Sequence, residues 1–353
     1  MTDIAPQLLE RVLAARGSGS PLVIRGHGSK AFYGLPSEGE ALEVAGHTGV
    51  VDYSPAELVI TVRAGTSVEE LATVLAASGQ QLAADPPRFD GRGTIGGSLA
   101  CNQSGPARPW AGSLRDALLG LRLINGAGEH LRFGGQVIKN VAGYDASRLQ
   151  AGAMGCFGVI TELSLKVMPL PERELHLQLA LDSAGDAIKE MSALQRRPLP
   201  LTGACYLQNT LHLRASGAAA GVEALERELK ERGFSSSEDI EFWQGLRDHG
   251  LAFFQGPAPL WRFSVAANSS LPFDDECLID WGGSQRWLRG SGSLTDFAGL
   301  IPAGAGEVCQ FRGPRDGEVF PERPDVYQEL QRRLKQSFDP DGLFNPGRLY
   351  GWL

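Results

Sequence analysis

Short apolar runs separated by glycine and proline dominate the first half of the chain, and they predict alternating strands and helices. Residues 22–24 form an apolar run that leads into a glycine-rich turn, and residues 57–63 have the composition of a strand. Ser67 and Glu70 form a capping-box pattern ahead of apolar positions at helical spacing, which predicts a helix that Gly79 ends. The chain therefore begins with a strand–helix unit.

Between residues 80 and 112 this periodicity almost disappears. The stretch is rich in Gly, Pro, Asn and Ser, which is typical of a long functional loop system. Farther on, residues 125–128 carry a hairpin signal between two predicted strands, 118–124 and 129–133. Residues 159–167 then alternate as a strand does and stop before a proline.

The pattern of predicted strands and helices changes near Pro171. Two strands plus a helix recur there, an arrangement typical of an α+β domain. The expected strands cover 176–181, 202–206, 211–214, 277–281 and 285–288, and the expected helices cover 187–194, 218–232 and 325–338. We expect a first domain over residues 1–171, a smaller α+β cap over 172–324, and a C-terminal helix and tail over 325–353 that returns to the first domain.

The composition is that of an ordinary globular protein, with 42% hydrophobic and 21% charged residues, and a length of 353 residues favours two domains. A net charge of −8, without any Lys/Arg run with interleaved aromatics, excludes nucleic acid as the expected partner. No segment has the roughly 18 apolar residues of a membrane span, and residues 1–20 lack a leader pattern. We expect a cytoplasmic location.

The 5 cysteines and 6 histidines are widely dispersed, without a Cys-x-x-Cys pair or two histidines at metal-ligand spacing. Buried, reduced thiols and no protein-bound metal are therefore expected. The 45 glycines are the unusual feature. Their clustering in the first half indicates loops that approach a ligand closely or need positive φ.

The glycine-rich turn after residues 22–24 is the first chemical candidate. Gly26-His-Gly-Ser-Lys-Ala31 matches the dinucleotide fingerprint G-x-G-x-x-A after a strand. Gly34 and Pro36 break the helix that this fingerprint requires, so a Rossmann site is rejected. Inward-facing backbone N–H groups can still form an anion-binding nest here, and a tight surface turn is the alternative.

Two further patches lie in the aperiodic stretch. Residues 86–98 form a second glycine loop, in which Thr and Ser hydroxyls stand beside paired glycines, and Asn102 and Ser104 continue it as a polar wall. Residues 112–116 place an arginine and an aspartate directly before a strand. Together the patches predict a pyrophosphate that two loops hold from opposite sides.

The order of these motifs resembles the FAD-binding domain of the p-cresol methylhydroxylase type, in the vanillyl-alcohol oxidase family. The motifs that carry the resemblance are R-G-x-G-S-K, D-P-P, G-T-I-G-G-S-L-A-x-N-x-S-G, W-x-G-S-x-R-D, K-N-V-A-G-Y-D and G-x-F-G-V-I-T-E-L-S-L-K-V, and the tail over residues 338–348 also matches. The resemblance implies an α+β fold, with a two-subdomain FAD-binding domain followed by a smaller α+β cap.

The same resemblance implies non-covalent FAD and assigns residues to it by position. Arg25, Gly26, His27, Gly28, Ser29 and Lys30 would form the first pyrophosphate loop, and Thr94, Ile95, Gly96 and Gly97 the second. Pro86, Asn102, Ser104 and Asp116 would line the flavin and ribityl side, and Arg115 would also bind the cofactor. Gly155, Gly158, Val159 and Ile160 would hold the adenine side, with strand core as the alternative for the last two, and Asn345 would return to the isoalloxazine.

Several other side chains keep two interpretations. Some relatives attach FAD covalently through a histidine directly before the Ser of the first loop, where this chain has Gly28, so His27 is expected only to line the loop. Asp145 and Arg148 are either catalytic or packing residues. The substrate-side candidates are Trp261, Arg262, Trp281 and Arg348, and an aromatic docking patch could be drawn from Trp243, Trp261, Trp281 and Trp287, with core packing as the alternative.

The K-N-V-A-G-Y-D element over residues 139–145, the short cap and the N-P-G-R-L-Y tail resemble the FAD-binding E subunit family of bacterial glycolate oxidases. That resemblance implies two partners, a larger FAD-dependent glycolate oxidase subunit and an iron–sulfur subunit. The assembly would oxidise glycolate to glyoxylate and pass electrons on to quinone, with partners holding it at the inner face of the membrane.

Two rival functions remain at this point. One is a stand-alone FAD-dependent 2-hydroxy-acid dehydrogenase, and the other is a structural subunit whose FAD is redox-idle. The chain lacks the G-D-G-N-x-H metal signature of self-sufficient dehydrogenases, and its last histidine, His249, lies in Arg-Asp-His-Gly. Catalytic residues are therefore left unassigned.

Overall fold

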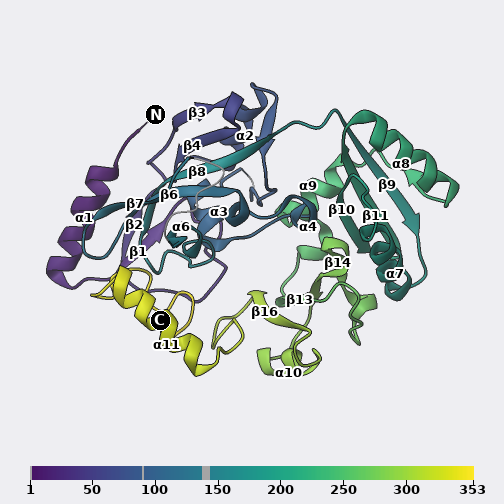
Figure 1. Cartoon of the computed structure of the whole chain (residues 1–353). Coiled ribbons are helices and arrows are strands. Elements are labelled where there is room, and N and C mark those ends of the chain that lie inside the picture. The colour runs from purple at the N-terminus through teal and green to yellow at the C-terminus, as the bar shows by residue number, and fades with distance from the viewer. Residues whose placement is uncertain (1, 90, 137–143) are drawn as a thin grey trace. The chain divides into compact units, whose positions relative to one another are not determined.

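The computed structural model describes residues 2–89, 91–136 and 144–353, and the chain forms two compact units. Unit 1 combines residues 1–104, 113–169 and 322–353, and unit 2 combines residues 105–112 and 170–321. Figure 1 labels the helices and strands of both. Three separate stretches of sequence therefore build unit 1.

Unit 1 contains a 6-stranded sheet with the strand order β3-β4-β8-β6-β7, in which β5 pairs with β8, and a separate parallel pair, β1-β2. Its strands are β1 (Leu22–Arg25), β2 (Glu40–Glu43), β3 (Val50–Ser54), β4 (Val59–Arg63), β5 (Gln80–Leu82), β6 (Leu118–Ile124), β7 (His130–Gly134) and β8 (Val159–Pro169). Its helices are α1 (Ala5–Ser18), α2 (Val68–Ala76), α3 (Ile95–Cys101), α5 (Leu114–Ala117), α6 (Ala146–Leu149) and α11 (Asp325–Phe338), with a 3₁₀ turn, η1 (Pro55–Glu57).

Local signals in the sequence explain several of these elements. Ser67 caps α2 by accepting a hydrogen bond from the Glu70 N–H at 3.0 Å, so the predicted helix start is confirmed. The predicted hairpin is confirmed as β6 and β7, which pair antiparallel. The strand expected at residues 159–167 is β8, which lies between β4 and β6 and contributes Leu163 and Leu165 to the core.

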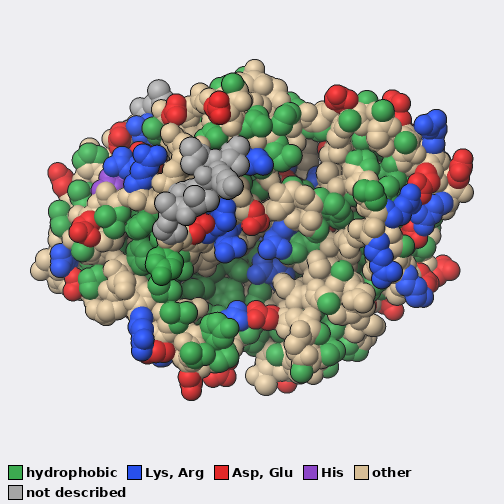
Figure 2. Space-filling view, viewed as in Figure 1, with side chains coloured by type: hydrophobic (Ala, Val, Ile, Leu, Met, Phe, Trp, Pro, Cys, Tyr) green, Lys and Arg blue, Asp and Glu red, His purple; other side chains and the backbone are tan. Residues whose placement is uncertain are grey.

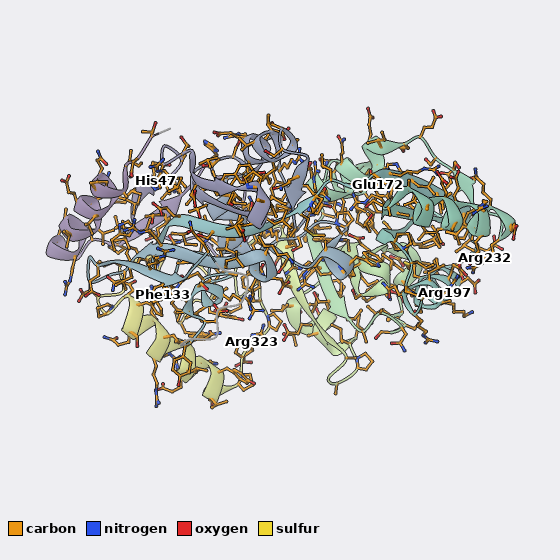
Figure 3. The ribbon with its side chains drawn as sticks, turned by 45° about the horizontal axis from the view of Figure 1, so that its top comes forward. His47, Phe133, Glu172, Arg197, Arg232 and Arg323 are labelled. Carbon is orange, nitrogen blue, oxygen red and sulfur yellow. The ribbon has the colours of Figure 1, made fainter. Side chains whose placement is uncertain are left out.

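The C-terminal tail is anchored to β1. The Leu22 N–H donates to the Leu343 carbonyl at 2.7 Å, and the Asn345 N–H donates to the Leu22 carbonyl at 2.9 Å. Phe344 is completely buried beside this contact. The helix expected at residues 325–338 is confirmed as α11. Its Phe338 packs against Phe133 of β7, which Figure 3 labels, with ring centres 5.8 Å apart. The tail is therefore hydrogen-bonded to β1, the strand from which the first glycine loop starts.

Unit 2 is an 8-stranded sheet with the strand order β12-β9-β11-β10-β14-β15-β13-β16. The strands are β9 (Arg173–Ala180), β10 (Leu201–Leu207), β11 (Thr210–Gly217), β12 (Ser235–Ser236), β13 (Leu260–Val265), β14 (Leu278–Asp280), β15 (Gln285–Arg289) and β16 (Gly306–Arg312). The helices and 3₁₀ turns are α4 (Arg108–Ala111), α7 (Ala184–Gln195), α8 (Ala219–Glu231), α9 (Ile240–Asp248), α10 (Leu294–Gly299), η2 (Ala252–Phe254), η3 (Asp274–Glu276) and η4 (Trp281–Gly283).

Helices α7 and α8 pack their apolar sides on one face of this sheet and carry charges on the other side. Met191 and Leu229 are completely buried there. Ion pairs such as Arg197–Glu228 and Arg232–Glu190 cross their outer surface, and Figure 2 shows both signs of charge interspersed over this part of unit 2.

The tryptophans of unit 2 do not form a docking patch. Trp243, Trp261 and Trp287 are 3%, 2% and 4% exposed, so the core-packing interpretation is correct for these three and they form no exposed anchor. Trp281 is half-buried and donates its indole N–H to the Gly105 carbonyl at 3.0 Å. Among the described residues, no helix is long and apolar enough to cross a membrane.

Candidate functional site

The first glycine loop follows β1 and presents unused backbone donors. The N–H groups of His27, Gly28 and Ser29 have no hydrogen-bond acceptor among the described residues. Gly28 has φ +71°, and a Cβ added there would meet no atom within 4 Å. Consecutive free N–H groups around a glycine of positive φ are typical of an anion-binding nest. The predicted phosphate loop therefore has suitable backbone geometry.

The second segment is in direct contact with the first. The His27 Nδ1 atom lies 3.1 Å from the Arg92 carbonyl, and Arg92 donates back to the His27 carbonyl at 3.4 Å. A Cβ on Gly26 would lie 2.6 Å from the Thr94 Oγ1 atom. Lys30 is buried, with its ammonium 5.4 Å from the centre of the Phe89 ring. His27 and Lys30 thus hold the two segments together.

Thr94 to Gly97 do not form a loop, and that expectation is corrected. They start helix α3, with Thr94 as its cap. Their N–H groups are already used, because Ile95 donates to the Thr66 carbonyl, Gly96 to the Ala64 carbonyl and Gly97 to the Thr94 Oγ1 atom. The glycines permit close packing: a Cβ on Gly96 would lie 2.6 Å from that of Ala64. FAD contacts from these four residues stay a proposal, and backbone donation from 95–97 does not support it.

The end of α3 carries a cluster of buried polar atoms without partners among the described residues. They are Ser98 Oγ, Asn102 Oδ1, both amide atoms of Gln103, Ser104 Oγ and Gln150 Nε2. An unsatisfied buried polar group costs about 1–3 kcal/mol, so several in one place indicate a polar ligand. Asn102 and Ser104 were expected here, whereas Gln103 and Gln150 were missed because an isolated glutamine carries no sequence signal. We call this set the polar cluster.

The turn over residues 152–158 packs on the same end of α3. The Gly152 N–H donates to the Leu99 carbonyl at 3.1 Å, and the Met154 N–H donates to the Ala100 carbonyl at 2.9 Å. Gly155 has φ +75°, and a Cβ there would lie 2.7 Å from the Asn345 Nδ2 atom. The turn is therefore fixed between the polar cluster and the C-terminal tail.

The side-chain amide of Asn345 forms its hydrogen bonds with the backbone of unit 1. Its Oδ1 atom accepts a hydrogen bond from the Ile24 N–H at 2.8 Å, and its Nδ2 atom donates to the Met154 carbonyl at 2.6 Å. One amide thus joins β1, which leads into the first loop, to the turn over 152–158. This arrangement favours a positioning role over the expected contact with the isoalloxazine.

A buried ion pair supports the same junction, and sequence reasoning missed it. The Lys335 ammonium donates to the carbonyls of Cys156 and Phe344, both at 2.7 Å, and lies 2.8 Å from the Asp339 carboxylate. Asp339 also accepts the N–H groups of Leu343 and Phe344. We call Lys335, Asp339 and Asn345 the tail clamp. The sequence carries no signal for this pair, because the apolar positions Val326 and Leu330 of α11 are exposed and Lys335 is the buried residue of this helix.

The remaining predicted residues have local structural roles. Asp116 forms a reciprocal capping box with Ser113 at the start of α5, and Arg115 is exposed. Burial raises the pKa of Asp145, but hydrogen bonds from Ser147 and from the Arg148 N–H, with the charges of Arg148 and Arg115, hold that pKa below its ordinary value. Asp145 and Arg148 thus cap and brace α6, with their charged atoms 3.3 Å apart.

Three more predicted residues lie in the interior, and part of one motif is not described. Pro86 is buried, and Val159 and Ile160 belong to the core at the start of β8, which fits their strand-core interpretation. A Cβ on Gly158 would lie 2.8 Å from the Ile124 carbonyl, so this glycine allows β8 to approach β6. Residues 139–143 of the K-N-V-A-G-Y-D element lie outside the described residues.

Comparisons with known proteins identify the family. Residues 5–134 match the family model described as an FAD binding domain. The chain is 43% identical to glycolate oxidase subunit GlcE of Escherichia coli (strain K12), over 99% of each protein. The chain belongs to the GlcE family. The resemblance expected from the motifs is confirmed, and so is FAD as the cofactor of a GlcE-family member.

More distant relatives extend beyond the GlcE family. Glycolate oxidase subunit GlcD of Bacillus subtilis (strain 168) is 30% identical over 51% of this chain and 39% of that protein. A solved structure of alkyldihydroxyacetonephosphate synthase superimposes with a TM-score of 0.70 at 15% identity, over 97% of this chain and 74% of that one. This likeness shows the fold that the GlcE-family chain shares, and it confirms the predicted α+β architecture.

Proposed function

We propose that this chain is the FAD-binding subunit of a glycolate oxidase complex. In this proposal the complex oxidises glycolate to glyoxylate, and electrons leave through a larger flavin subunit and an iron–sulfur subunit toward quinone, with membrane attachment through those partners. The support is GlcE-family membership over 99% of the chain, together with the second similarity, to a GlcD subunit.

The polar cluster beside the open first loop is the observation that carries this proposal. A ligand with a pyrophosphate and a polyhydroxylated chain needs anion-binding N–H groups at one point and hydroxyl and amide partners farther along. Unit 1 supplies N–H groups at His27, Gly28 and Ser29, and it supplies side-chain atoms at Ser98 and Gln103, among others. The residues present therefore fit FAD.

Bound FAD would supply hydride or electron acceptance at its flavin ring. The chain's own residues would bind and orient it. Backbone N–H groups of the first loop would hold the phosphates, the polar cluster would satisfy the ribityl hydroxyls, and the tail clamp would fix the turn over residues 152–158. We propose non-covalent attachment, because Gly28 stands where relatives with covalent FAD carry histidine.

The proposed function is tested by single-turnover reduction of the flavin with glycolate. The chain is compared alone and after co-expression with the larger flavin subunit and the iron–sulfur subunit. We expect its own flavin to be reduced only in the complex. Reduction of the isolated chain at the rate of the complex would replace this proposal with a stand-alone dehydrogenase, and a flavin that stays oxidised in the complex would make the chain a structural subunit.

A further inference from the structure

Arg348 connects the C-terminal tail to the segment that follows the first loop. Its Nη1 atom donates to the Leu35 carbonyl at 3.2 Å, and its Nη2 atom lies 3.4 Å from the carbonyls of both Lys30 and Ala31. The sequence suggests Arg348 as a substrate-side residue. Because these donors end on backbone carbonyls, the structure favours a positioning role for this side chain instead.

The backbone around this contact is hydrogen-bonded as well. The Leu35 N–H donates to the Arg348 carbonyl at 2.9 Å, and the Ser37 hydroxyl donates to the Pro346 carbonyl at 2.8 Å. Gly34 has φ +77°, and a Cβ there would lie 2.8 Å from the Arg348 carbonyl, so glycine is needed for the two segments to lie this close. We call these contacts the loop–tail junction.

The loop–tail junction is continuous with the free N–H groups of the first loop. The Ala31 N–H donates to the Gly28 carbonyl at 3.0 Å, so the turn that carries these N–H groups ends on a residue whose own carbonyl accepts from Arg348. At the other end of the loop, Asn345 accepts a hydrogen bond from the last part of β1. The tail therefore holds the loop on both sides of residues 27–29.

Arg348 also brings positive charge close to the polar cluster. Its side chain is half-buried. Burial raises the pKa of the Cys101 thiol, and the nearby charges of Lys30 and Arg348 partly offset this rise. Cys101 is the last residue of α3, next to Asn102 of the polar cluster, so both cations lie within electrostatic reach of that end of the helix. Positive charge at this place attracts an anionic ligand.

We propose that Arg348 is a positioning residue for FAD. Its guanidinium fixes the backbone that follows the first loop, and the N–H groups of residues 27–29 are thereby held so that they converge on the FAD pyrophosphate. Such groups bind an anion together only when they converge on it, and a loop already held in its binding conformation loses less entropy on binding. This inference rests on the part of the proposed function that places the pyrophosphate at the first loop.

The test uses the purified full chain without partners. FAD is titrated into the FAD-free wild type, Arg348→Met and Arg348→Lys, and the affinity is measured by flavin fluorescence. We expect the dissociation constant to rise roughly tenfold in Arg348→Met, because a loop that holds its binding conformation about a tenth of the time lowers the affinity by that factor. Arg348→Lys should recover part of the loss, since an ammonium group can still donate to some of these carbonyls.

A second readout separates positioning from a general loss of structure. At saturating FAD, the phosphorus NMR resonances of the bound pyrophosphate should shift in Arg348→Met, whereas the visible absorption bands of the flavin should match those of the wild type. Ser37→Ala is a milder variant that removes only the hydrogen bond to Pro346. Its dissociation constant should rise about two- to tenfold, and it decides the question with the same readouts if Arg348→Met does not fold.

Arg332→Met is the matched control. Arg332 also belongs to the C-terminal segment, but it donates to Gln328 at 3.1 Å and its guanidinium carbon lies 4.9 Å from the centre of the Trp352 ring. Its removal should therefore change neither the FAD affinity nor the phosphorus resonances.

Two results would overturn the inference. One is an Arg348→Met chain that matches Arg332→Met in FAD affinity and in its phosphorus resonances. The other is a set of phosphorus resonances that stay unchanged while the flavin bands shift. Because no turnover is measured, a complex that fails to oxidise glycolate would count against the proposed function alone.

Discussion

Removal of the Lys335 ammonium tests the inference that the C-terminal tail builds the FAD site. Lys335 is 8% exposed and Asp339 is 1% exposed. Lys335→Met leaves the Asp339 carboxylate buried with only the Leu343 and Phe344 N–H groups, and it deprives the carbonyls of Cys156 and Phe344 of their donor. Removing one partner of a buried ion pair typically costs about 3–5 kcal/mol.

That cost predicts a large and measurable change. For a cooperative unit of the size of unit 1, about 1 kcal/mol shifts the unfolding midpoint by roughly 2–4 °C, so Lys335→Met should lower the midpoint of unit 1 by about 10 °C. FAD affinity should fall as well, because the turn over residues 152–158 loses its anchor at Cys156. Thermal unfolding and fluorescence titration of the FAD-free chain measure the two effects. Lys335→Met combined with Asp339→Asn should regain part of the stability, since the uncompensated charge is gone.

Arg333→Met provides the control for the same helix. Arg333 forms an exposed pair with Glu329, 2.8 Å apart, so its removal should change neither the midpoint nor FAD binding. If Lys335→Met unfolds at the same temperature as Arg333→Met and binds FAD equally well, the tail clamp does not hold the site, and the reasoning from its buried contacts is wrong.

Three further predictions follow from single residues. Acid denaturation should release all FAD into the supernatant, because Gly28 replaces the covalent histidine; flavin in the pellet contradicts this. Gly155→Ala should cost roughly 1–3 kcal/mol and weaken FAD binding in titrations, because φ is +75° and Asn345 is in the way. Burial lowers the pKa of His47 from 6.5 to about 4. Up to about 3 kcal/mol of stability, present above pH 6.5, should therefore be lost as the pH falls toward 4, and His47→Gln should flatten that decline in thermal unfolding.

Elements with explicit local signals could be predicted from the sequence, whereas those made by tertiary contacts could not. Helix α2 has its Ser67 cap, and α11 has apolar positions at helical spacing. The sequence predicts a loop where α3 forms, because Gly96 and Gly97 are poor helix formers. It forms because Gly96 packs on Ala64 and the first N–H groups find acceptors in that neighbouring segment. Helix α1, Ala5–Ser18, is not among the predicted elements, although Pro6 stands in its first turn, where proline is favoured, and Leu8, Val12 and Ala15 have helical spacing.

The same distinction applies to the candidate site: parts with a local sequence signal could be predicted, and parts made by tertiary contacts could not. Glycine-rich motifs located the first loop and the turn over residues 152–158, because backbone positions that need positive φ favour glycine, which is visible in the sequence. The polar cluster required the structure, since only the arrangement around Gln103 and Gln150 shows that their buried amide atoms lack partners among the described residues. The tail clamp also required it, because nothing in residues 335–345 indicates that Lys335 meets the Cys156 carbonyl.

In the proposed FAD site, the tail clamp would give the C-terminal segment a part in cofactor binding, although this segment is far from the first loop in the sequence. Asn345 holds the strand that leads into the first loop, and Lys335 holds the turn beside the polar cluster. Both contacts end on backbone carbonyl or N–H groups, so they fix loop positions and leave the loop side chains available to FAD. A ligand that requires both loops in place is then coupled to the docking of the tail, since any factor that binds only the folded arrangement stabilises all of its parts.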